Sequence, residues 1–222
     1  MEKLSFLAVL PLLFVSCATE QAGHILTPQE IPPDIVTPIP FIITDHKYKS
    51  EGRNIPEWVS LFLEGGIQSV ESLAAFNGRH VFISQNEGTN FNALNHWKEG
   101  FSPELDFPRL AAARIDARFF SETPLPDQVY GAFFEALIRT ASNARWSGAV
   151  KEDDFWIRRR FIENNAESET ENWLFLILVS IEKPVFALQL DTVFSNTRPN
   201  PPPSRGQLAA INRVKDNFFE GF

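Results

Sequence analysis

The chain has 222 residues, a net charge of −8 and one cysteine, and 21 of its residues are phenylalanine. So acidic a composition disfavours nucleic acid as a partner, because nucleic-acid binding depends on Lys and Arg side chains that neutralise phosphates. One thiol excludes a disulfide within the chain, so an aromatic-rich apolar core has to hold the fold, and a chain of this length can bury one.

Residues 1–16 have the features of a secretory signal. Lys3 supplies a positive charge, and the following stretch from Leu4 to Val15 is apolar apart from Ser5 and Pro11. This stretch is shorter than the roughly twenty apolar residues that a membrane-spanning helix requires. The segment is therefore predicted to be a signal peptide.

The next residues indicate how the protein is attached. Leu13 to Cys17, which reads "LFVSC", resembles a lipobox, the motif at which bacterial lipoprotein signals are cut before a lipid-bearing cysteine. Phe14 departs from the usual leucine, as in the relaxed motifs of spirochaetal lipoproteins. The alternative is ordinary signal-peptidase cleavage after Ala18. Because a lone thiol in an oxidising envelope is otherwise unexplained, we interpret Cys17 as the lipid-attachment site.

Lipidation at Cys17 predicts a location. Two or more acyl chains, such as palmitate, hold a protein stably on a membrane where one chain is marginal. We therefore expect a lipid anchor in the bacterial cell envelope, in the outer membrane, with the protein facing the periplasm or the cell surface.

Residues 17–54 are predicted to form a tether between the lipid and the domain. Five prolines interrupt any helix there and favour extended geometry: Pro28, Pro32, Pro33, Pro38 and Pro40. The stretch from Phe41 to Thr44 has an alternative interpretation as a short edge strand.

The globular domain is predicted to span residues 55–196. It opens with a short apolar turn that ends at Gly65-Gly66, followed by an amphipathic piece from Ile67 to Phe76. His80 to Ser84 is expected to form a strand, and the polar residues from Asn86 to Gly88 a turn after it.

Three helices are predicted after this turn. Asn90 is placed to cap a short helix that carries apolar residues at intervals of three. Pro108 to Phe120 is expected to form a helix that begins at its proline, followed by a helix from Asp127 to Arg145. Glu135 and Arg139 are spaced to form an ion pair on the surface of that last helix.

After these helices, the spacing of the apolar residues changes to the one typical of strands. Phe155 to Ile162 and Trp173 to Ile181 are predicted to form an antiparallel hairpin joined by an acidic turn. The second strand is apolar on both faces, which favours a central position beneath a helix. Val185 to Phe194 fits either a strand or a helix, and helix is favoured. The sequence thus predicts an α+β fold, an antiparallel sheet of about three to four strands packed on two main helices.

Residues 197–222 are predicted to form a proline-rich linker and a C-terminal amphipathic helix, Gln207 to Phe219. The apolar stripe of this helix either folds back onto the domain or binds a partner. The stripe residues assigned to partner binding are Leu208, Ile211, Phe218 and Phe222.

The sequence contains no nucleophile elbow, phosphate-binding glycine loop or zinc-protease helix. The four histidines are scattered and have no cysteine partners, so we expect no metal, no cofactor and no catalytic residues. One polar loop is a candidate ligand site, because such loops hydrogen-bond sugars or peptide backbone. Its candidate residues are Asn86, Asn90, His96 and Trp97. The alternative is that these asparagines serve as turn and cap residues.

Three features in order suggest a family. They are "PEW" at residues 56–58, the alanine-rich "LAAARIDARF" at residues 110–119, and a hairpin whose last strand is strongly apolar. Together they resemble the bacterial twenty-kilodalton lipoprotein family and the related N-terminal region of a flagellar assembly protein, over residues 55–182. The resemblance implies an envelope-anchored α+β domain that has no known catalysis and acts through contacts.

These observations predict a non-enzymatic, lipid-anchored envelope protein that acts as an assembly or interaction module. Its expected partners are the membrane, through the N-terminal lipid, and an unidentified envelope protein. The alternative is an envelope lipoprotein that binds a small ligand, a sugar or a peptide.

Overall fold

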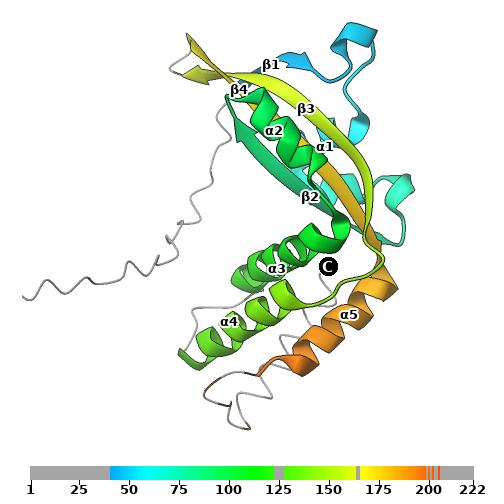
Figure 1. Cartoon of the computed structure of the whole chain (residues 1–222), viewed down its shortest axis with the longest axis vertical. Coiled ribbons are helices and arrows are strands. Elements are labelled where there is room, and N and C mark those ends of the chain that lie inside the picture. The colour runs from blue at the N-terminus through cyan, green and yellow to red at the C-terminus, as the bar shows by residue number, and fades with distance from the viewer. Residues whose placement is uncertain are drawn as a thin grey trace, which may run out of the picture. The chain divides into compact units, whose positions relative to one another are not determined.

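A four-stranded antiparallel sheet is the centre of the fold in the computed structural model, which describes residues 41–122, 128–163 and 166–198, together with 200, 202 and 205. Within those residues the chain forms this sheet and five α-helices, so the predicted α+β class is confirmed. Figure 1 shows the sheet above a group of three helices, α3, α4 and α5.

The sheet has the strand order β1-β3-β4-β2. Its strands are β1 (Phe41–His46), β2 (Arg79–Gly88), β3 (Val150–Glu163) and β4 (Ala166–Glu182). The predicted hairpin corresponds to β3 and β4, and β4 is central as expected. Its alternating side chains are buried on both faces, since Leu176 and Leu178 belong to one apolar cluster and Ile177 and Val179 to the other.

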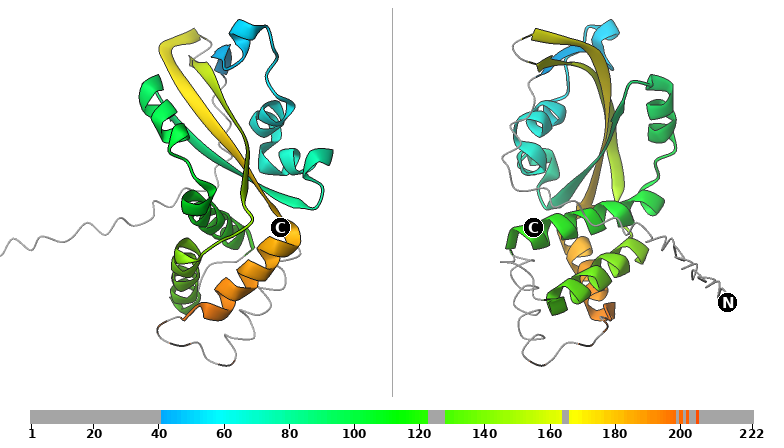
Figure 2. Two further views of the ribbon diagram at one scale, coloured as in Figure 1. Left: turned by 45° about the vertical axis from the view of Figure 1, so that its right-hand side comes forward. Right: turned by 90° about the vertical axis from the view of Figure 1, so that its left-hand side faces the viewer.

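Each face of the sheet is covered by helices. The helices are α1 (Glu57–Glu71), α2 (Phe91–Glu99), α3 (Pro103–Glu122), α4 (Gln128–Asn143) and α5 (Lys183–Asn196). Figure 2 shows α1 and α2 on opposite faces of the sheet. Trp58, Val59 and Val70 of α1 join the first cluster, whereas α3, α4 and α5 build the second.

The domain begins earlier than predicted. Phe41–His46 pairs with β3, so the edge-strand alternative is the observed one and the boundary at Ile55 is wrong. The reason is a set of ring contacts: Phe41 meets Phe161 edge-on at 6.3 Å, and the guanidinium of Arg159 lies 5.2 Å from each ring centroid. The compact unit that contains the sheet starts at Ile39.

Glycine and proline affect two of the predicted helices. Gly65-Gly66 interrupts α1 as predicted, because Gly66 has non-helical backbone angles with a φ of 71°, which suits glycine, and the helical pieces on either side meet there at a kink. The helix predicted to begin at Pro108 is α3, which begins at Pro103 and has Pro108 in its interior. Its start is fixed by the carboxylate of Asp106, which accepts a hydrogen bond from the Ser102 N–H at 2.9 Å.

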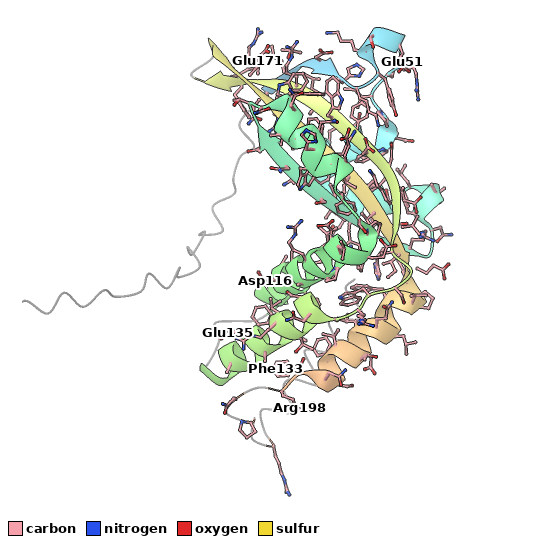
Figure 3. All side chains as sticks on the ribbon, viewed as in Figure 1. Glu51, Asp116, Phe133, Glu135, Glu171 and Arg198 are labelled. Atoms are coloured by element: carbon pink, nitrogen blue, oxygen red, sulfur yellow. The ribbon has the colours of Figure 1, made fainter. Side chains whose placement is uncertain are left out.

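Two predicted turns are strand instead. The residues Asn86 to Gly88 continue β2, because β4 runs alongside and the Gly88 N–H donates to Oδ1 of Asn172 at 2.9 Å. The acidic turn is shortened because β4 already begins at Ala166. Glu171, labelled in Figure 3, forms an ion pair with Arg160 of β3 at 2.7 Å. Tertiary pairing therefore converts polar segments to strand.

Other helix predictions are confirmed. Asn90 caps α2, since its Oδ1 accepts a hydrogen bond from the Ala93 N–H at 3.1 Å. The helix predicted from Asp127 to Arg145 is α4, and Val185 to Phe194 is helical within α5. The predicted C-terminal helix lies outside the described residues. No described helix is long and apolar enough to cross a lipid bilayer.

A carboxylate closes the free edge of β2. Oε1 of Glu71, the last residue of α1, accepts hydrogen bonds from the Val81 N–H at 2.7 Å and from Nη1 of Arg114 at 2.9 Å. The same Nη1 donates to the Val81 carbonyl at 2.6 Å, and Nδ1 of His80 lies 3.6 Å from Glu71 Oε1. Side chains thus satisfy the outward-facing N–H and carbonyl of Val81 on this edge and connect α1 to α3.

The Glu71 carboxyl predicts a pH-dependent stability. Burial alone would raise its pKa, but contacts with His80 and Arg114 and the Val81 N–H outweigh burial and lower the pKa to about 2. Since the folded pKa lies below the ordinary 4.5, the stabilisation is present above pH 4.5 and is lost as the pH falls toward 2. We expect Glu71→Gln to lower the free energy of unfolding by about 2 to 3 kcal/mol at neutral pH.

Urea denaturation at several pH values tests this expectation. The gap between wild type and Glu71→Gln should narrow as the pH falls from 4.5 toward 2. Glu64→Gln, an exposed carboxylate on the same helix, is the matched control and should be neutral. A gap that stays constant over this pH range would contradict the assigned role of the carboxylate.

Candidate functional site

The described residues form a half-open cavity of about 520 Å³ between α4, the loop that follows it and α5. Figure 2 shows these two helices packed against each other below the sheet. The volume lies within the range typical of small-molecule sites. The lining residues include Arg139, Asn143, Arg145, Trp146, Gln189 and Asn196. The cavity is therefore a concave candidate site formed by the described residues.

The floor of the cavity is apolar and rigidly held. Trp146 is 7% exposed and stacks on Phe186 with ring centroids 5.2 Å apart. Phe107 meets the same indole edge-on at 5.8 Å, and the indole Nε1 donates to the Ala141 carbonyl at 3.0 Å. Val193 of α5 is also buried and lines the cavity. Stacking and hydrogen bonding fix the indole in one orientation.

The polar wall is held by backbone groups. Gln189 of α5 is hydrogen-bonded to the loop after α4. Its Oε1 accepts from the Ser147 N–H at 2.6 Å, and its Nε2 donates to the Ser147 carbonyl at 2.9 Å. Nδ2 of Asn143 donates to the Arg139 carbonyl at 2.7 Å. Thr140 likewise donates to the Ala136 carbonyl at 2.7 Å. These side chains are preorganised. The Gln189 amide is fully used, because it also accepts from Ser147 Oγ at 3.3 Å and donates to the Val185 carbonyl at 3.1 Å, whereas Oδ1 of Asn143 remains available to a ligand.

The cavity carries uncompensated positive charge. None of its lining residues is acidic. Among the described residues, the guanidiniums of Arg139 and Arg145 form neither a salt bridge nor a hydrogen bond. The ion pair predicted between Glu135 and Arg139 is not formed; Glu135, labelled on α4 in Figure 3, is exposed. Two whole positive charges therefore remain at the cavity.

A second cluster of charges lies at the sheet. Three of the seven lysines in the sequence meet at the Asp154 carboxylate of β3. The distances from Nζ to the carboxylate oxygens are 2.8 Å for Lys47, 3.7 Å for Lys98 and 3.0 Å for Lys151. These lysines come from the end of β1, from α2 and from β3, so Asp154 joins three elements.

The Asp154 carboxylate and the lysine ammoniums around it stabilise one another's charged forms, so the cluster is structural. Burial alone would raise the pKa of the Asp154 carboxyl, but hydrogen bonds and charges from Lys47 and Lys151 outweigh burial and lower it. Burial would likewise lower the pKa of the Lys47 ammonium, but Asp154 raises it. Each of the three lysines thus contacts the carboxylate, although three positive charges share one negative charge. The cluster ties α2 to the sheet and leaves the cavity as the candidate site.

The sequence-predicted ligand residues do not converge on the cavity. Asn90 is occupied as a helix cap, and Asn86 Oδ1 accepts a hydrogen bond from the Glu87 N–H at 2.9 Å. The side chain of His96 is 84% exposed, whereas Trp97 packs against the apolar core. The cap alternative therefore describes Asn90, whereas Asn86 is a residue of strand β2 and forms no turn.

Other predicted sites cannot be placed. Cys17 and the C-terminal stripe residues Leu208, Ile211, Phe218 and Phe222 lie outside the described residues. Within the described part of the chain, no group of three or more His, Cys, Asp or Glu side chains is arranged to hold a metal ion.

Sequence reasoning missed Arg139, Arg145 and Gln189. The first was assigned to an ion pair with Glu135, and the others come from different elements that only folding brings together. A usable signal did exist: Arg139 and Arg145 flank a short segment that contains no acidic residue.

Asp154→Asn tests the lysine cluster. The substitution leaves three ammoniums without their carboxylate, so we expect the free energy of unfolding to fall by about 1 to 2 kcal/mol in low salt. High salt should reduce this loss because ions screen the repulsion. Urea titrations at two salt concentrations measure both, with Glu135→Gln as the exposed control. An unchanged stability in low salt would show that the cluster contributes nothing.

Comparison of the chain with models of protein families, with curated proteins and with solved structures finds no match.

Proposed function

We propose that the protein is a non-enzymatic, lipid-anchored component of the bacterial cell envelope whose domain acts as an interaction module. The observation that carries the proposal is the sequence "LFVSC", which ends at the lone cysteine Cys17 directly after a short apolar segment. Acyl chains on that thiol would hold the protein in the outer membrane. The resemblance to the twenty-kilodalton lipoprotein family supports the same function.

The residues after Cys17 suit this arrangement. Five prolines occur between Cys17 and the first strand, which begins at Phe41. Proline-rich segments are extended and semi-rigid, so they act as spacers. The domain is thereby presented at a distance from the membrane to a partner in the envelope.

The C-terminal stripe is the proposed contact with that partner. Leu208, Ile211, Phe218 and Phe222 recur at helical spacing after a proline-rich stretch. An apolar stripe of this kind fits a groove on another protein.

A second candidate function is the binding of a small ligand. The cavity between α4 and α5 favours it, because a rigid apolar floor and a preorganised polar wall are typical of ligand sites. In this candidate function the ligand site is the cavity and not the loop around Asn86 to Trp97.

Cys17→Ala tests the anchor. The variant should no longer incorporate radioactive palmitate, and it should move from the detergent phase to the aqueous phase on partition, because no thiol remains to be acylated. Thr19→Ala, two residues away, is the control and should behave as wild type. Labelling of Cys17→Ala, or a wild-type mature protein that starts at Thr19, would contradict lipidation at this residue.

Deletion of residues 205–222 tests the stripe. We expect the midpoint of thermal unfolding to change by no more than about 3 °C, while crosslinking in the native envelope loses its neighbouring protein. A matched full-length variant, Asn212→Ser, alters the same segment outside the stripe and should keep the crosslink. A large drop in thermal stability would show instead that the stripe belongs to the core.

A further inference from the structure

We infer that the cavity between α4 and α5 binds a small organic anion, a carboxylated or phosphorylated compound of about sugar size, through Arg139 and Arg145. This inference rests on the ligand-binding candidate function and names the chemical class of the ligand. It concerns a site that the sequence did not indicate.

Most other arginines of the described domain form ion pairs, which Arg139 and Arg145 do not. In the described residues, seven arginines form ion pairs with acidic side chains, as an acidic protein readily allows. They are Arg53, Arg79, Arg109, Arg114, Arg158, Arg159 and Arg160. Arg139, Arg145, Arg198 and Arg205 form none, and of these four only Arg139 and Arg145 line the cavity. Both side chains are exposed, and guanidinium groups stay charged at every physiological pH, so two residues of the cavity carry a positive charge that has no acidic partner.

The geometry of the donors is the second argument. A guanidinium is a planar fork of N–H donors that matches the two oxygens of a carboxylate or phosphate. Arg139 comes from α4 and Arg145 from the loop that follows, so they approach the cavity from two elements. The C-terminal end of α4 opposes an anion with about half a negative charge, which two whole positive charges outweigh.

The rest of the lining describes the remainder of the ligand. Asn143 and Asn196 place amide groups on the wall, and such groups hydrogen-bond hydroxyls, whereas the amide of Gln189 is already occupied by Ser147 and Val185. Trp146 and Val193 supply the apolar floor, which suits the carbon face of a ring or chain. An anionic head, several hydroxyls and a short carbon skeleton together fit this cavity better than an apolar molecule does.

Calorimetric titration of the full-length protein tests the inference with four probes: citrate, glucose 6-phosphate, inorganic phosphate and uncharged glucose. We expect citrate or glucose 6-phosphate to bind, to raise the unfolding temperature by mass action and to bind more weakly as salt increases. The double variant Arg139→Gln with Arg145→Gln should lose at least about tenfold in affinity. Binding of inorganic phosphate alone would reduce the ligand class to a simple anion and overturn the inference.

The control variant removes two positive charges outside the cavity. Arg53→Gln with Arg109→Gln alters two exposed arginines outside the cavity and should bind the anions as wild type does. Equal losses in both double variants would show non-specific attraction and overturn the site. Glucose binding that is indifferent to Arg139 and Arg145 would refute the anion while keeping the ligand-binding function. Failure of all four probes, with a screen of peptides and lipids also negative, would refute both.

Discussion

Burial of β4 on both of its faces is the constraint on which the rest of the domain depends. Leu176 and Leu178 face one apolar cluster while Ile177 and Val179 face the other, and all four are at most 1% exposed. A strand that is apolar on both sides is stable only when both are covered. It therefore requires α1 on one face and the remaining helices on the other. Because α5 follows β4 directly, the strand also positions one wall of the cavity.

Two groups of paired charges lie around this core. Glu71 closes the edge of β2 with Arg114, and Asp154 gathers three lysines at the sheet. Both carboxyls have a lowered pKa, because their cationic partners outweigh the effect of burial. Arg139 and Arg145 differ from these groups because they line a cavity and have no acidic partner. Local rules are most often broken at functional sites, which is why the cavity carries the further inference.

The proposed functions use different parts of the chain. The anchor depends on Cys17 and the partner contact on the stripe from Leu208 to Phe222, both defined by sequence. Ligand binding depends on Arg139 and Arg145 in the folded domain. An envelope protein that is tethered at one end and binds an anion in its domain would combine these roles without catalysis.

Local patterns in the sequence were sufficient for the α+β class, the central strand β4, the cap at Asn90 and helices α4 and α5, because periodicity and capping act over a few residues. Tertiary structure alone decided that Phe41 opens an edge strand and that Asn86 continues a strand. In both cases pairing with a distant strand outweighed local propensity. Only folding brought Arg145 beside α5, because the contacts that build a cavity join residues far apart in sequence.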